Sequence, residues 1–223
     1  MNTDNFELKQ QIILACRRLE EMGYVVGTYG NVSARIDGGL IITPSRVDYA
    51  TLTPEDLVTV SLDGDILEGH RLPSSELEVH RFIFVARPDV GAVVHTHSLY
   101  ATAASCTGKG IPVIVEEQSQ VIGDEIRCTN YVPAGQHAAL GEEVARALGS
   151  SNAVLLANHG TVSCGRNMDE ALFTARIAER VAQMYLLASA AGGVQLIPPE
   201  HVVSEHHRYR HKYGTALDRV QTE

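Results

Sequence analysis

Apolar residues near the start of the chain recur at the period of an α-helix. The positions, separated alternately by four and three residues, are Leu8, Ile12, Ala15, Leu19 and Met22. This spacing lines the apolar side chains along one helix face, and the glycine that follows at position 23 commonly marks a helix end. The pattern predicts an amphipathic helix that ends at Gly23.

Two segments in the middle of the chain are also predicted to be helical. One extends from Pro73 to Arg87, where Ser74 is suited to cap the first turn and Pro88 to end the helix. The other extends from Gly135 to Leu148.

The longest predicted helix follows Asn167. With Glu170 three residues later, this asparagine forms a variant of the capping box. The apolar residues of the helix are Leu172, Ala175, Ala178, Val181, Ala182 and Tyr185. Beyond it, residues 201–212 are rich in histidine and arginine, with His206, His207 and His211 close together. We interpret this stretch as a helix surface or an interface; a second metal site is the alternative.

Short apolar and β-branched runs between the helices predict strands. They lie at 40–42, at 57–62 with a hairpin turn at Asp63 and Gly64, at 91–97, at 111–115 and at 155–160. Strands thus occupy the middle of the chain, and helices surround them. We predict an α/β fold in which a mostly antiparallel central sheet lies between helices, and the sequence leaves the strand order open.

The composition indicates an ordinary globular protein. The chain has 223 residues, of which 44% are hydrophobic and 20% charged, enough for a sizeable core in one domain or at most two. Its formal net charge of −9 argues against a nucleic-acid partner or an anionic membrane partner. No apolar run approaches a membrane span, and the first ten residues are too polar for a signal peptide. We therefore expect a cytoplasmic protein.

The four cysteines are scattered along the chain without paired spacing. They are Cys16, Cys106, Cys128 and Cys164, each in apolar or mixed surroundings. Buried free thiols in a reducing compartment fit this distribution better than disulfides or a metal cluster.

Three histidines stand at the ends of two predicted buried strands. His95 and His97 are two residues apart, so their side chains point to the same face, and His159 ends the run that starts at Leu155. Three imidazoles with one open position are a usual ligand set of a catalytic zinc. An isolated His-x-His pair is also common for structural reasons. The third histidine at a matching strand end favours the metal site.

Three short segments offer groups that bind anions such as phosphate. The first has small side chains and exposed backbone N–H groups, the second has two hydroxyls and a guanidinium, and the third stands at a predicted helix N-terminus. Their residues are Thr28, Gly30 and Asn31, then Thr43, Ser45 and Arg46, then Ser74 and Ser75. Each segment taken alone also fits an ordinary turn or cap.

Glu76 follows the third segment in the first turn of the predicted helix. Glutamates are common there because they favour the helix dipole. Beside a metal, the same carboxylate is suited to be a ligand, or a base acting on a metal-polarised substrate.

Five motifs occur in order along the chain. They run from Gly27 to Ser33, from Ile42 to Ser45, from Leu72 to Glu76, from Arg87 to His97 and from Asn158 to Gly160. Together they resemble the class II aldolase/adducin-type family, and most closely its zinc-dependent L-fuculose-phosphate aldolases. The resemblance implies a three-layer α/β/α fold, with residues 1–223 as a single domain, and a homotetramer with active sites between subunits. It also implies cleavage of a ketose 1-phosphate to dihydroxyacetone phosphate and an aldehyde.

The resemblance also assigns roles to individual residues. His95, His97 and His159 match the ligands of one Zn²⁺ per subunit, which Co²⁺ or Mn²⁺ can replace. Glu76 matches an acidic residue that is a fourth ligand and then the general base. Tyr213 matches a C-terminal tyrosine directed towards the substrate. The implied phosphate-binding residues are Thr28, Gly30, Asn31, Thr43, Ser45, Ser74 and Ser75.

Two positions depart from the family pattern. Arg46 stands where a glycine is usual, and its guanidinium either adds a phosphate contact or narrows the pocket. Glu116 stands where a tyrosine of a neighbouring subunit reaches the aldehyde end, and it replaces that catalytic acid only if burial raises its pKa. The substrate therefore stays open between fuculose phosphate and a 5-deoxy- or 5-methylthio-pentulose phosphate.

Other reactions of the same superfamily are alternatives. A sugar-phosphate 4-epimerase would use the same metal and bond cleavage, but epimerases have aspartates where Glu76 and Gln120 stand here. A decarboxylase or a dehydratase is a further alternative. A non-catalytic adducin-like interaction module has no need of three zinc ligands with Glu76. We predict a metal-dependent aldehyde-lyase of carbohydrate metabolism.

Overall fold

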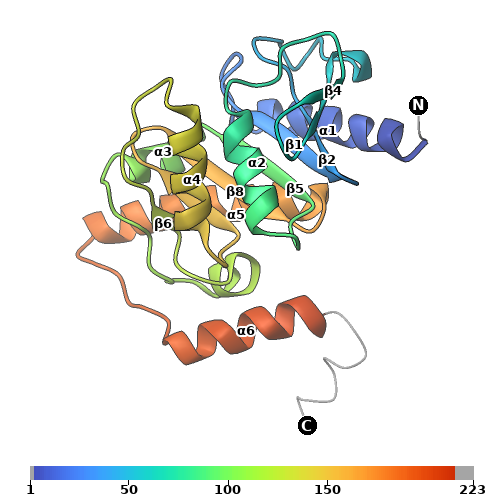
Figure 1. The fold of residues 1–223 in the computed structure, drawn as a ribbon. Coiled ribbons are helices and arrows are strands. Elements are labelled where there is room, and N and C mark those ends of the chain that lie inside the picture. Colours follow the sequence, from blue (N-terminus) through green and yellow to red (C-terminus); the bar gives the residue numbers. More distant parts are fainter. Residues whose placement is uncertain (1–2, 214–223) are drawn as a thin grey trace.

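A computed structural model describes residues 3–213, which form one central sheet with helices on both faces (Figure 1). The strands are β1 (Asn31–Ile36), β2 (Gly39–Ile42), β3 (Val58–Ser61), β4 (Ile66–Glu68), β5 (Ala92–Thr96), β6 (Arg127–Cys128), β7 (Ala153–Leu156) and β8 (Gly160–Gly165). They hydrogen-bond in the order β4-β3-β2-β1-β5-β8-β7-β6. Every neighbouring pair is antiparallel except β6 with β7.

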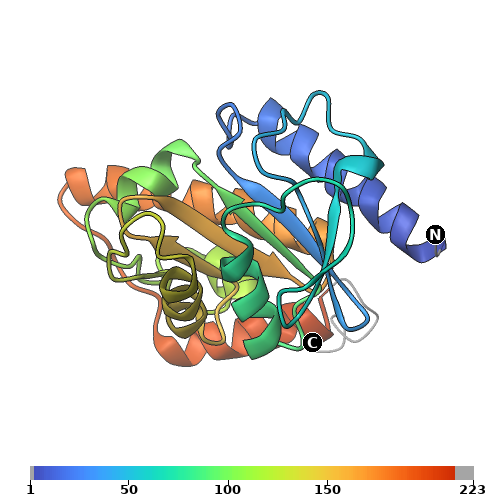
Figure 2. The same cartoon turned by 45° about the horizontal axis from the view of Figure 1, so that its top comes forward.

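Helices connect and cover these strands. They are α1 (Thr3–Glu21), α2 (Leu77–Ala86), α3 (Leu99–Ser105), α4 (His137–Leu148), α5 (Met168–Ala190) and α6 (Pro199–His211), with a 3₁₀ turn η1 (Pro54–Asp56) and a π-helical turn η2 (Gln118–Ile122). Figures 1 and 2 show α2 and α4 on one face of the sheet and α1 and α5 on the other. The predicted α/β/α fold with a mostly antiparallel sheet is confirmed.

The two faces of the sheet bury separate apolar clusters, because successive side chains of a strand point to opposite sides. On β5, Val93 packs with residues of α2 and α4, whereas Ala92 and Val94 pack with residues of α1 and α5. On β7, Leu155 joins a third cluster formed with α3, η2 and the second half of α5. The strand ends that carry the histidines are therefore held from both faces.

The predicted start of one helix and its predicted cap are wrong. Helix α2 begins at Leu77 rather than near Pro73, because the Ser74 N–H donates to the Thr43 carbonyl (3.0 Å) and an isolated bridge joins Pro44 to Pro73. Ser74 therefore does not cap the helix; its hydroxyl accepts the Glu76 N–H at 3.2 Å in the turn before it.

The run 111–115 also differs from its prediction as a strand. It forms only one isolated bridge, between Ile111 and Ile126. The next residue, Pro112, has no N–H to donate to a ladder, and the chain turns into η2 instead. The predicted Asn167 cap is confirmed, since its side-chain oxygen accepts the Glu170 N–H at 2.9 Å.

All four cysteines are free, as predicted. Cys16 and Cys164 are buried, and burial raises the pKa of both thiols. Contrary to the prediction, Cys106, which follows the last turn of α3, is exposed, and Cys128 is only partly buried. Within residues 3–213, no helix is both long enough and apolar enough to cross a bilayer.

Candidate active site

The three histidines meet at one end of the central strands. His95 lies in β5, His97 directly follows this strand, and His159 lies in the turn between β7 and β8. Asn158 has a φ of 57°, a left-handed conformation that asparagine tolerates and that reverses the chain in this short turn. Because β5 pairs with β8, the turn brings His159 against His95.

The imidazoles surround a common point. Their ring centroids are 4.8 to 4.9 Å apart, and their planes are inclined by 68 to 74° to one another. The Nε2 atoms of His95 and His97 are 3.0 Å apart, and one nitrogen of each ring lies within 4.8 Å of the others. The predicted convergence of the three histidines is present in the fold.

Glu76 closes the fourth side of this cluster from the residue before α2. Its Oε2 lies 3.2 Å from His95 Nε2, and its Oε1 lies 3.0 Å from His159 Nε2. The side chain is 16% exposed, and its Oε2 also accepts a hydrogen bond of 2.7 Å from the Asn31 amide. One carboxylate therefore faces two of the three histidines.

The site favours neutral imidazoles at His95 and His97 and an ionised carboxylate at Glu76. Burial lowers the pKa of His95, and burial with the neighbouring His95 lowers that of His97 to about 3. Burial alone would raise the pKa of Glu76, but His95, His159 and the Asn31 amide outweigh it and hold that pKa well below its usual range.

These groups fit a divalent metal. Neutral imidazole nitrogens and a carboxylate are the donor set of zinc sites, and ligand atoms sharing a tetrahedral zinc at about 2.0–2.1 Å lie about 3.3–3.4 Å apart. The separations of 3.0 to 3.2 Å given above are close to this value. In addition, His95 Nδ1–H donates to the Thr161 carbonyl at 3.0 Å, which leaves the Nε2 lone pair facing the cluster.

A polar cavity of about 320 Å³ opens beside the histidines. It brings together most of the predicted phosphate-binding residues, namely Thr28, Gly30, Asn31, Ser45, Ser74 and Ser75, and it also includes Arg46. Thr43 does not line it, and its hydroxyl accepts the Val32 N–H at 3.2 Å. A Cβ at position 30 would lie 2.6 Å from Val25 and 3.0 Å from the His95 carbonyl, so the close approach of this segment to β5 requires glycine.

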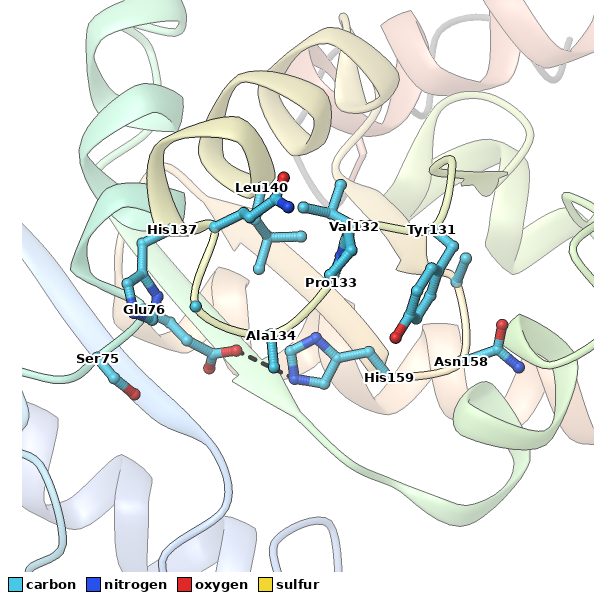
Figure 3. Close-up of a pocket in the computed structure, with 13 residues that line it drawn as sticks. Ser75, Glu76, Tyr131, Val132, Pro133, Ala134, His137, Leu140, Asn158 and His159 are labelled. Carbon is cyan, nitrogen blue, oxygen red and sulfur yellow. Dashed lines mark ion pairs between the residues drawn. The ribbon is translucent and has the colours of Figure 1, made fainter.

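A second cavity, of about 310 Å³, shares Ser75, Glu76 and His159 with the polar one (Figure 3). Its other walls are mainly apolar. They come from the segment before α4 and the first turns of this helix, with Tyr131, Val132, Pro133, Ala134 and Leu140, and from Ala157 and Asn158 in the turn between β7 and β8. No sequence pattern indicates this cavity, because these residues follow no helix or strand period. The cluster of Pro133 and Gly135 marks a loop but does not indicate what the loop faces.

The two residues predicted to act from a neighbouring subunit lie in neither cavity. Glu116 is exposed just before η2. Tyr213 follows α6, is 55% exposed, and places its ring 5.4 Å from that of Tyr209. A single chain therefore does not bring either residue to the histidines.

Comparison with known proteins agrees with this geometry. The sequence profile described as Class II Aldolase and Adducin N-terminal domain matches residues 10–186. An L-fuculose phosphate aldolase from Haemophilus influenzae is 37% identical over 213 residues, covering 95% of this chain and 97% of the relative. A 5-methylthioribulose-1-phosphate/5-deoxyribulose-1-phosphate aldolase from Rhodospirillum rubrum is 35% identical over 214 residues, covering 96% and 94%.

The fold also matches that of a known aldolase. A solved structure of an L-fuculose 1-phosphate aldolase superposes with a TM-score of 0.88 at 30% identity, covering 94% of this chain and 98% of that one. Profile, relatives and fold thus agree over nearly the whole chain, and the protein belongs to the class II aldolase and adducin family.

Proposed function

We propose that this protein is a cytoplasmic, zinc-dependent class II aldolase that cleaves a ketose 1-phosphate to dihydroxyacetone phosphate and an aldehyde. The observation that carries the proposal is the position of Glu76 and His159, which face both a polar and an apolar cavity. A ketose 1-phosphate has the same division, with a phosphate at one end and the aldehyde-forming carbons at the other. The similarity to aldolases of both substrate types supports the same reaction.

The metal would be held by His95, His97 and His159, and Glu76, whose carboxylate faces two of them, would be a fourth ligand. Zn²⁺ suits this donor set, and Co²⁺ or Mn²⁺ can replace it. When bound, such a metal supplies a Lewis acid that polarises the substrate carbonyl and stabilises negative charge next to it.

The polar cavity would bind the phosphate. Its hydroxyls at Ser45, Ser74 and Ser75 donate hydrogen bonds, and the guanidinium of Arg46 adds a positive charge. Binding there orients the sugar so that its carbonyl end lies towards the histidines and its far end towards the apolar cavity. Arg46 therefore fits the phosphate contact that the sequence left open.

Cleavage breaks the bond between C3 and C4 of the sugar. The C4 hydroxyl loses its proton and C4 becomes the aldehyde carbon, while C3 keeps the bonding electrons and takes up a proton to give dihydroxyacetone phosphate. Glu76 would move the proton at C3. Its carboxylate lines both cavities and lies beside His95 and His159, which supports this role.

The apolar cavity favours an aldehyde half without a polar end. Figure 3 shows Ala134 and Leu140 in the loop and helix around Glu76 and His159. Covering a methyl or methylthio group with such a surface lowers the free energy of binding, because apolar area leaves water. A terminal hydroxyl at the same place would lose its hydrogen bonds to water. We therefore propose a 5-deoxy- or 5-methylthio-pentulose phosphate in preference to a substrate with a polar end.

Ala134→Leu tests this preference by filling the cavity. We expect kcat/KM for 5-methylthioribulose 1-phosphate to fall about tenfold, because poor accommodation of a few apolar atoms costs about 1–3 kcal/mol. Ala139→Leu is the matched control, since Ala139 lies on the exposed part of α4 and outside the cavity. Equal kinetics for the two variants would contradict the assignment of the cavity.

We also propose a homotetramer with active sites between subunits, in which Glu116 and Tyr213 approach the histidines of a neighbour. Mixing His95→Ala subunits with Tyr213→Phe subunits after dissociation tests this arrangement. If the sites are shared, random mixing restores on the order of a quarter of them. No recovery from two impaired parents, or full activity of an isolated monomer, would contradict the proposal.

The reaction itself is tested by incubating the zinc-loaded protein with a panel of ketose 1-phosphates. We expect release of dihydroxyacetone phosphate from at least one 5-deoxy- or 5-methylthio-pentulose phosphate. Epimerised sugar phosphate or carbon dioxide, without dihydroxyacetone phosphate, would instead identify one of the alternative reactions.

A further inference from the structure

A chain of buried polar side chains leads from the interior to Glu76. Ser33 Oγ lies 2.6 Å from His80 Nδ1, and His80 Nε2 is in hydrogen-bond contact with Asn31 Oδ1. The other end of the Asn31 amide donates to Glu76 Oε2 at 2.7 Å. Ser33 and His80 have no exposed surface, and Asn31 is 4% exposed.

Regular secondary structure explains why these residues meet. Asn31 and Ser33 are two apart on β1, so both point to the face of the sheet that α2 covers. Asn31 is also the direct cross-strand neighbour of His95. His80 follows Glu76 by four positions, one helical turn, so its ring reaches the β1 residues behind the carboxylate.

The hydrogen-bonding roles follow from the charge of Glu76. An ionised carboxylate only accepts, so Asn31 must present its NH₂ group to Glu76 and its carbonyl oxygen to His80. His80 Nε2 must then carry a proton and donate it to that oxygen. Its Nδ1 accepts from the Ser33 hydroxyl, which keeps the ring in this tautomer.

We infer that His80 is a positioning residue for Glu76, acting through Asn31. This inference rests on the proposed function, in which Glu76 faces the metal and moves a proton. Without the donor at His80 Nε2, the Asn31 amide is free to turn over and direct its oxygen at the carboxylate. The carboxylate then loses its hydrogen bond and its fixed orientation towards His95 and His159.

Burial of an imidazole at this place is otherwise unfavourable. The remaining inward-facing residues of α2 are apolar, as expected for a helix against a sheet, and they are Val79, Ile83 and Phe84. Burial lowers the pKa of His80 to about 3, so the ring is neutral and adds no ion pair to the fold. Its two hydrogen bonds, to Ser33 and to Asn31, both belong to the chain of side chains that ends at Glu76.

Two substitutions at His80 separate positioning from packing. His80→Gln keeps an N–H donor near the position of Nε2, whereas His80→Leu fills similar space without a donor. Both are compared with the wild type by zinc dissociation constant, measured by chelator competition, and by proton exchange at dihydroxyacetone phosphate in D₂O. Exchange is expressed per folded, zinc-loaded chain, so that loss of stability alone does not change it.

We expect His80→Leu to lose about 10- to 100-fold in exchange turnover and to bind zinc about tenfold more weakly. His80→Gln should stay within about threefold of wild type in both. The inference would be overturned if His80→Leu stayed within twofold of wild type in exchange turnover and zinc affinity. It would also be overturned if His80→Gln were as impaired as His80→Leu.

If His80→Leu does not fold, Ser33→Ala provides the test. This variant keeps the His80 ring and removes only the hydrogen bond from Ser33 that fixes the tautomer of that ring. We expect exchange turnover to fall at least threefold, and an unchanged value would overturn the inference. If the wild type itself exchanges no proton, the proposed function fails. The zinc affinities of the His80 or Ser33 variants then still decide the positioning role.

Discussion

Glu76→Gln is expected to lower the rate of proton exchange between dihydroxyacetone phosphate and solvent about 100- to 10,000-fold. The carboxylate is held ionised beside His95 and His159, and a neutral amide of the same shape cannot take up the proton. Exchange is measured by NMR in D₂O at saturating zinc, so that a weaker metal affinity does not add to the effect.

Phosphate binding and folding should survive this substitution, because the hydroxyls of the polar cavity are unchanged. Glu78→Gln is the matched control: Glu78 lies two residues further on, in the first turn of α2, but it pairs with Arg81 at 2.6 Å and lines neither cavity. Its exchange should stay within about twofold of wild type. If Glu76→Gln exchanged as fast as this control, Glu76 would not be the base.

Removing one histidine of the cluster should lower the metal content and the release of dihydroxyacetone phosphate by an amount similar in size. His95→Ala and His159→Ala each delete a nitrogen ligand from a set of three, and we expect purified variants to contain far less than one metal ion per chain. Metal content is measured by elemental analysis after dialysis against a metal-free buffer, together with the release of dihydroxyacetone phosphate, which should be lost in parallel.

His137→Ala is the control for this experiment. His137 lines the apolar cavity beside Glu76 and His159 but does not belong to the histidine cluster, so its removal should leave the metal content unchanged. Full metal content in both His95→Ala and His159→Ala would refute the assigned ligands.

The features that the sequence predicts well are those set by local periodicity. Helix α1 and the long helix α5 follow from apolar spacing, and β5 follows from a short apolar run. The strand predicted at 155–160 is wrong, because this run contains the end of β7, a turn at 157–159 and the first residue of β8. Since His95 and His97 share a face at the end of β5 and His159 follows β7 by three residues, the histidine cluster could be predicted as soon as the strand ends were assumed to meet.

Features set by contacts between distant segments could not be predicted in this way. The role of His80 depends on a contact with Asn31, 49 positions away, and its own surroundings in the sequence read as an ordinary helix. The apolar cavity depends on how the loop before α4 folds over Glu76. The helix start at Leu77 depends on pairing of Ser74 with Thr43, which overrides the local capping pattern.

The central claim is that a metal at the three histidines enables cleavage of a ketose 1-phosphate. Its most direct test is to strip the protein with a chelator and titrate Zn²⁺ back while measuring release of dihydroxyacetone phosphate from 5-methylthioribulose 1-phosphate. We predict no release from the stripped protein, and a linear rise that reaches its plateau at one zinc per chain. Release that persists after stripping, or that does not return with zinc or with Co²⁺ or Mn²⁺, would contradict the claim.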